Sequence, residues 1–311
     1  TMENTRAKTT RNSLILLLTA TIWGMAFVSQ SKGMDYMHPF TFNGVRSLIG
    51  AAGILVYILI SRKIAGDKAA KLDWKLNVRA GLLCGIFLTI ASTLQQFGIK
   101  YTSVGKAGFI TTLYIIFVPM FGIFLKKKVA PVVWAAAGMA AVGMYLLCMT
   151  ESLRLGAGDI MVFLCAIAFA IQIMTVDHYA ARIDGAVVSC IQFTVCGVVC
   201  CIGALIWGQP TFGQIQEGLG ALLYAGVLSC GVGYTLQIVG QKGLNPTVAA
   251  LIMSLESVIA TISGWIAYKI GFLSMDQTLT PRQIAGCIIV FVAVILVQLP
   301  PEWFRFGKKN A

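Results

Sequence analysis

Arg46 and Glu256 are the two charged side chains near the middle of long apolar stretches of this sequence. Arg46 lies in residues 36–61, and Glu256 lies in residues 243–268. A guanidinium group binds a carboxylate or a phosphate through two parallel hydrogen bonds. A carboxyl group inside a membrane binds an amine or carries a proton. These two residues are therefore candidates for recognising an anionic group and a cationic group.

Structural roles are the alternative for both residues. Glu256 could tie its own helix to the neighbouring helices. Arg46 could pair with Glu256 or with backbone carbonyls, or its long side chain could reach toward the outer membrane face. If both side chains instead reach one cavity, a zwitterionic molecule would suit them.

Uncharged polar and aromatic side chains also occur within the apolar stretches. A lone polar side chain in lipid costs free energy unless it faces a partner or a water-filled cavity. Together with Arg46 and Glu256, these side chains form the predicted substrate-binding set: Trp23, Asn43, Gln95, Gln96, Tyr114, Gln172, Gln192, Tyr234 and Gln237. Because residues 129–150 and 283–301 nearly lack such groups, we expect the other apolar stretches to line a central cavity.

Ten apolar stretches, each long enough to cross a bilayer, must position these residues. A hydrocarbon core of ~30 Å takes about 20 helical residues to span, and backbone groups in lipid must bond within their own segment. The stretches are residues 12–31, 36–61, 80–99, 107–125, 129–150, 160–176, 185–216, 218–241, 243–268 and 283–301. The chain is 58% hydrophobic and 12% charged. The predicted fold class is an all-α integral membrane protein with ten transmembrane helices.

The net charge of +12 indicates a membrane topology rather than nucleic-acid binding. With ten spans, most Lys and Arg residues of the connections fall on the side that holds both termini. The positive-inside rule then places both termini in the cytoplasm. We expect cytoplasmic tails at residues 1–11 and 301–311, a location in a bacterial or archaeal cytoplasmic membrane, and no nucleic acid as a partner.

The sequence repeats itself with a shift of 142 residues. Residues 106–125 align with residues 248–267, where Leu113 matches Leu255. The same shift places Gln95 on Gln237, although the match is weak at individual residues.

Two halves follow from this repeat, residues 12–150 and residues 157–300, and each is predicted to hold five helices. Because five is odd, the second half enters the membrane from the opposite side. Two inverted five-helix repeats are the architecture of secondary carriers, which expose a central site to each side of the membrane in turn.

The sequence predicts no metal or other cofactor. All nine cysteines fall inside predicted spans, and none belongs to a C-x-x-C pair. The chain has no Walker A motif, which would indicate direct use of ATP, and no H-E-x-x-H or G-x-S-x-G motif. An intramembrane enzyme remains the alternative from a different class, but the prediction is that the protein is not an enzyme.

Several local motifs resemble those of the drug/metabolite transporter superfamily, in its ten-helix EamA branch. They are Ile22-Trp23-Gly24, Arg46, Leu255-Glu256-Ser257-Val258 and residues 280–286. The resemblance covers residues 12–299. One departure is Ser257, which stands where the family usually has proline, so we expect the ninth helix to be straighter or to kink elsewhere.

The resemblance implies export or exchange of a small polar or amphipathic metabolite through a central cavity between the halves. Substrates in the superfamily include amino acids, nucleosides, sugar phosphates and cationic drugs. Amino acids or related compounds are the leading hypothesis, with cationic-drug efflux and sugar-phosphate exchange as alternatives. The expected partners are the lipid bilayer, the small-molecule substrate, and a proton or a counter-substrate.

Overall fold

The computed structural model describes residues 2–66, 72–125, 131–148, 156–274, 276–278 and 280–298. Every regular element among these residues is a helix. The first half holds α1 (Met2–Gly33), α2 (Pro39–Ala65), α3 (Trp74–Ile99), α4 (Val104–Thr112), α5 (Tyr114–Phe124) and α6 (Pro131–Cys148). The second half holds α7 (Ala157–Tyr179), α8 (Gly185–Gly203), α9 (Phe212–Glu217), α10 (Leu219–Leu223), α11 (Tyr234–Gly240), α12 (Pro246–Met253), α13 (Glu256–Lys269) and α14 (Pro281–Gln298). The segments Ala204–Gly208 and Tyr224–Gly233 are π-helical.

Eight helical segments are long and apolar enough to cross a membrane. They are Lys8–Gly33, Pro39–Ala65, Trp74–Ile99, Val104–Phe124, Ala157–Tyr179, Gly185–Gly208, Leu219–Gly240 and Pro246–Lys269. Two shorter apolar helical segments, Pro131–Gly143 and Ile284–Ala293, lie within the stretches predicted to be the fifth and tenth spans. The prediction of an all-helical, membrane-spanning chain is therefore confirmed.

The structure describes the expected N-terminal tail from residue 2 but not the expected C-terminal tail. Helix α1 begins at Met2, so residues 2–11 are helical and continuous with the first spanning helix. The expected C-terminal tail, residues 301–311, lies outside the described residues, as do residues 149–155 between the two predicted halves.

Side-chain caps and prolines begin several of the spanning helices. Ser103 accepts a hydrogen bond from the backbone N–H of Lys106, and Asn245 accepts one from Thr247. Such caps satisfy N–H groups that have no partner within the helix. Pro246 follows as the first residue of α12, where proline costs no hydrogen bond.

Two of the spanning segments are interrupted near their middle. Helix α4 ends at Thr112 and α5 begins at Tyr114, while α12 ends at Met253 and α13 begins at Glu256. The interruptions fall at Leu113 and at residues 254–255, which the sequence repeat aligns.

The ninth predicted helix thus has a tightened turn at Ser254 and Leu255, whose backbone dihedrals stay right-handed helical, although it lacks the proline usual in the family. Ser254 Oγ donates to the carbonyl oxygen of Leu251 at 2.7 Å, and Ser257 Oγ donates to that of Ser254 at 2.8 Å. Serine hydroxyls that bind carbonyls of the preceding turn satisfy backbone groups that a break sets free.

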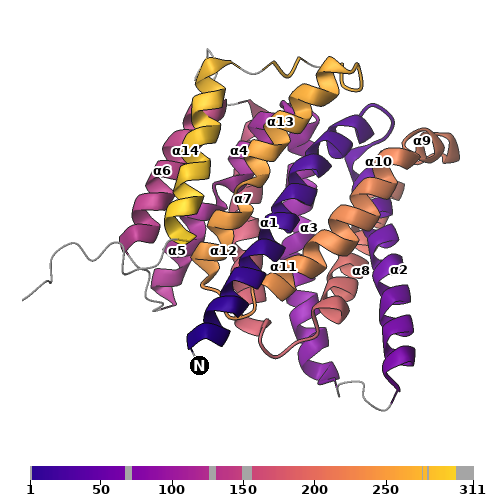
Figure 1. Ribbon diagram of the computed structural model, residues 1–311. Helices are drawn as coiled ribbons and strands as arrows, with labels where there is room; N and C mark the ends of the chain where they lie inside the picture. Colours follow the sequence, from indigo (N-terminus) through magenta and orange to yellow (C-terminus); the bar gives the residue numbers. More distant parts are fainter. Residues whose placement is uncertain are drawn as a thin grey trace, which may run out of the picture.

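The most extensive helix contacts join the first half of the chain to the second. They are α2 with α8, α3 with α7 and α8, α6 with α14, and α1 with α13. In Figure 1, α6 and α14 lie side by side at one edge of the bundle, and α2 and α8 lie together at the other. The core is therefore an interface between the halves.

Glycine permits the close approach of α6 and α14. A Cβ atom added at Gly143 would lie 2.9 Å from the carbonyl oxygen of Gly286 and 2.9 Å from Ile289 Cβ. Because one of these atoms belongs to the backbone, a side chain at Gly143 must push the two helices apart.

We predict that Gly143→Val lowers the free energy of unfolding by about 1–3 kcal/mol, the usual cost of overpacking. The matched control is Gly138→Val on the same helix, where an added Cβ has no neighbour within 4 Å. Thermal unfolding of the purified protein in detergent measures the difference. Equal melting temperatures for the two variants would contradict this account of the α6–α14 contact.

Candidate functional site

A buried central cavity lies between the two halves of the bundle. It is lined by Trp23, Phe27, Gln30, Asn43, Arg46, Leu88, Ser92, Gln95, Thr111, Tyr114, Phe169, Gln172, Ile173, Phe193, Ser229, Cys230, Tyr234, Gln237 and Glu256. All of these residues lie outside α6 and α14. The cavity is therefore built from the helices that carry polar groups, as the sequence pattern predicts.

The structure brings most of the predicted site residues to this cavity. The predicted residues that line it are Trp23, Asn43, Arg46, Gln95, Tyr114, Gln172, Tyr234, Gln237 and Glu256. Gln96 and Gln192 are not among the lining residues.

Gln96 and Gln192 are fully buried elsewhere in the bundle, which corrects their predicted placement. Gln96 Nε2 donates to the backbone carbonyl of Gln30 at 3.2 Å. Neither amide atom of Gln192 has a hydrogen-bond partner. Successive residues of a helix point about 100° apart, so Gln95 can face the cavity while Gln96 faces a neighbouring helix.

Arg46 forms the basic end of the cavity, and neighbouring residues of its own helix, α2, orient its side chain. Its Nε donates to Asn43 Oδ1 at 2.9 Å, and its guanidinium carbon lies 5.5 Å from the centre of the Phe42 ring. Asn43 Nδ2 in turn donates to Ser92 Oγ at 3.1 Å and to Cys200 Sγ at 3.3 Å. These contacts orient the guanidinium group without neutralising its charge.

Glu256 forms the acidic end of the cavity. It is the first residue of α13, only 3% exposed, and its Oε1 accepts a hydrogen bond from the Tyr114 hydroxyl at 3.0 Å. Tyr114 is the first residue of α5, 142 residues earlier in the chain. The two residues therefore occupy equivalent positions, each directly after the interruption of its spanning segment.

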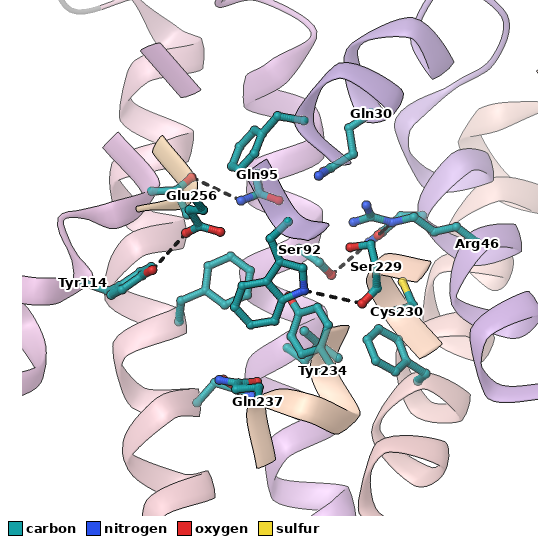
Figure 2. Close-up of a pocket in the computed structure, with 18 of the residues that line it drawn as sticks. Gln30, Arg46, Ser92, Gln95, Tyr114, Ser229, Cys230, Tyr234, Gln237 and Glu256 are labelled. Carbon is teal, nitrogen blue, oxygen red and sulfur yellow. Dashed lines mark hydrogen bonds between the residues drawn. The ribbon is translucent and has the colours of Figure 1, made fainter. Parts of the chain in front are cut away.

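Arg46 and Glu256 do not pair with each other. Figure 2 shows Glu256 with Tyr114 on one side of the cavity and Arg46 on the opposite side. The ion pairs among the described residues are Lys32–Asp35 and Lys106–Asp159. The alternative that Arg46 pairs with Glu256 is therefore wrong for this conformation.

Aromatic rings form an apolar wall between these two ends. Trp23 and Tyr234 have ring centroids 4.5 Å apart, and Phe193 meets Tyr234 edge-on at 5.0 Å. Trp23 Nε1 donates to the Ser229 carbonyl oxygen at 3.4 Å (Figure 2). This carbonyl lies in the π-helical segment Tyr224–Gly233, and π-helical turns are frequent at functional sites.

Gly24 explains how α1 approaches the acidic end. A Cβ atom on Gly24 would lie 2.7 Å from the Glu256 carbonyl oxygen and 2.6 Å from Ile259 Cβ. The Ile22-Trp23-Gly24 motif thus places a ring in the cavity and lets α1 cross the start of α13.

The sequence did not predict three of the lining residues, Ser229, Phe193 and Phe169. A backbone acceptor and ordinary phenylalanines carry no distinguishing sequence signal.

The cavity is narrow in this conformation. The volume open to the centre of a water molecule is about 30 Å³, which is room for about two water molecules. On one side, Gln172 and Gln237 exchange hydrogen bonds of 3.1 and 3.4 Å. On the other side, Lys106 Nζ lies 2.6 Å from Asp159 Oδ2 and joins α4 to α7. Binding of a larger molecule therefore requires movement of the helices that line the cavity.

A membrane-spanning helical bundle with a polar cavity between broken helices is the architecture of a membrane transporter. The EamA-like transporter family model matches residues 11–149 and again residues 156–299. The chain therefore belongs to the EamA-like transporter family, part of the drug/metabolite transporter superfamily, and the predicted resemblance is confirmed.

Similar proteins cover nearly the whole chain. One is an "Uncharacterized transporter" of Archaeoglobus fulgidus, 27% identical over 91% of this chain and 84% of its own length. Another is "Uncharacterized transporter YwfM" of Bacillus subtilis, 24% identical over 93% of this chain and 94% of its own. A solved crystal structure superposes with a TM-score of 0.73 at 16% identity, over 96% of this chain and 99% of that one, and shows the same fold.

We predict that Tyr114→Phe lowers the free energy of unfolding by about 1–3 kcal/mol, because a buried carboxyl group loses its hydrogen-bond donor. The matched control is Tyr57→Phe, whose ring is 60% exposed. Thermal melts in detergent provide the comparison. If Tyr114→Phe and Tyr57→Phe melt together, the Tyr114–Glu256 hydrogen bond contributes nothing to stability.

Proposed function

We propose that this transporter is a secondary carrier that moves a small zwitterionic metabolite, an amino acid or a related compound, by alternating access. The observation that carries the proposal is the separation of charges in the central cavity. Arg46 is oriented by Asn43 but makes no ion pair with any described residue, and Glu256 lies across the cavity from it. A molecule with an anionic and a cationic end complements both.

The carboxylate of the substrate binds the guanidinium group of Arg46, whose planar donors suit a carboxylate. Its ammonium group binds Glu256, which Tyr114 holds in place. The apolar part of the substrate lies against Trp23 and Tyr234, and the amide side chains of the cavity bind its remaining polar atoms.

Two inverted five-helix bundles would supply the two states. Three observations support this arrangement: helix breaks at repeat-related positions, core contacts that join the halves, and a family model that matches twice in succession. In this proposal both termini lie in the cytoplasm, the protein lies in the cytoplasmic membrane, and transport runs as export or exchange. A proton or a counter-substrate provides the driving force.

A panel of zwitterions and their blocked derivatives tests the substrate class. We expect a bound amino acid to raise the melting temperature in detergent. Its methyl ester and its N-acetyl derivative should bind about 10–100-fold more weakly, because each loses one charge-assisted interaction.

Variants then assign the two ends. In Arg46→Gln the penalty for the methyl ester should disappear, while in Glu256→Gln the penalty for the N-acetyl derivative should disappear. Equal binding of all forms by the native protein would contradict the zwitterion hypothesis. Tighter binding of the methyl esters and of organic cations would instead favour cationic-drug efflux.

Proton coupling is tested separately in proteoliposomes. If Glu256 carries the coupled proton, an imposed pH gradient drives uptake by the native protein but not by Glu256→Gln. Exchange of internal for external substrate at equal pH should survive in the variant at saturating substrate concentration, because exchange needs no net proton transfer. Unchanged dependence on the pH gradient in Glu256→Gln would remove Glu256 as the proton carrier.

A further inference from the structure

Two polar side chains of α8 are buried without a hydrogen-bond partner among the residues that the structure describes. Ser189 and Gln192 are 0% exposed, and neither Ser189 Oγ nor either amide atom of Gln192 is bonded. Buried polar atoms in native proteins are nearly always satisfied, so each exception calls for an explanation. Three such atoms within one helical turn, on residues three apart, form a polar strip on one face of α8.

Along the axis of α8, this strip lies between the level of the central cavity and the end of the bundle that holds the N-terminus. Phe193, which follows Gln192, lines the cavity, and Val188, which precedes Ser189, belongs to a separate apolar cluster. That cluster joins four helices through Ala80 and Cys84 of α3, Val176 and Tyr179 of α7, Val188 of α8 and Ile238 of α11. Along the helix axis, the strip therefore lies between the level of the cavity and this cluster, which we call the apolar plug.

The Gln172–Gln237 pair closes the cavity above this plug. The two amides bind each other reciprocally and are 0% and 1% exposed. They come from α7 and α11, the same helices that contribute Val176 and Ile238 to the plug. The hydrogen bonds and the apolar cluster thus hold the same two helices together.

Below the plug, three hydrogen bonds from side chains to backbone carbonyls join neighbouring segments of the chain. Gln241 Nε2 donates to the Ile173 carbonyl, Lys242 Nζ to the Ile183 carbonyl, and Asn12 Nδ2 to the Lys242 carbonyl, at 3.3, 3.2 and 2.7 Å. Gln241 Oε1 and Asn12 Oδ1 are again buried and unbonded. Buried unbonded atoms thus occur at the N-terminal end as well as in the strip.

We propose that Ser189 and Gln192 line the route by which the substrate passes between the central cavity and the N-terminal end of the bundle, and that the Gln172–Gln237 pair is the latch that closes this route. The inference rests on the proposed carrier function. The strip is unbonded here because the route is closed and dry. When α7 and α11 separate, water and the polar groups of the substrate satisfy it.

Cysteine labelling in proteoliposomes tests the route without knowledge of the substrate. Ser189→Cys changes one atom and places a thiol in the strip. We expect a small, membrane-impermeant maleimide to label it only from the side that holds the N-terminus, above the background of the native cysteines. Thr194→Cys is the matched control, since Thr194 is exposed on the outer surface of the same helix, where lipid would cover it and leave no water path to the thiol.

Release of the latch should increase the labelling. Adding Gln172→Ala to Ser189→Cys removes both hydrogen bonds and should raise the labelling rate about tenfold, as expected for a tenfold larger open population. Gln96→Ala is the matched control, because Gln96 is an equally buried amide whose hydrogen bond to Gln30 lies outside this latch. It should leave the labelling rate of Ser189→Cys unchanged.

Two results would overturn the proposal. One is labelling of Ser189→Cys no faster than that of Thr194→Cys, both in the native latch and with Gln172→Ala. The other is an equal increase with Gln96→Ala and Gln172→Ala, which would indicate general loosening. Labelling as expected, together with no binding of zwitterions, would disprove the proposed substrate class but keep the route. Zwitterion binding without labelling would do the reverse.

Discussion

The hydrogen bond between Tyr114 and Glu256 joins the two halves of the protein at equivalent points. Each residue directly follows a tightened turn in the middle of its span, and each lies at a position that the sequence repeat aligns. A carboxyl group at this depth is costly unless it is bonded or faces a wet cavity. The acidic end of the cavity depends on satisfying it, and the Tyr114 hydroxyl does so from the other half of the chain.

The same constraint explains the other polar groups. Arg46 is satisfied in part by Asn43, which Ser92 and Cys200 orient in turn. The arrangement leaves a fixed positive charge facing the cavity, where an anionic group of a substrate can bind to it. The amide pair of Gln172 and Gln237 satisfies itself, and can do so only while α7 and α11 stay together. These amide hydrogen bonds, formed between two helices of the second half, thus favour the closed form without preventing its opening.

Much of the fold could be predicted from the sequence because the hydrocarbon core imposes length and apolarity on every span. The presence of Arg46 and Glu256 around one cavity also follows from the cost of burying charge. The faces of Gln96 and Gln192 could not be predicted, because the rotation of a helix depends on packing against its neighbours. The tightened turn before Glu256 could not be predicted from the sequence either, since serine hydroxyls stand in for the expected proline.

The central claim is that Arg46 and Glu256 bind the two ends of one substrate molecule. The most direct test is a structure of the protein with the zwitterion that raises its melting temperature most. The account predicts the carboxylate within hydrogen-bonding distance of the Arg46 guanidinium and the ammonium group within that distance of Glu256. A ligand bound elsewhere, or an Arg46–Glu256 ion pair in the occupied cavity, would contradict it.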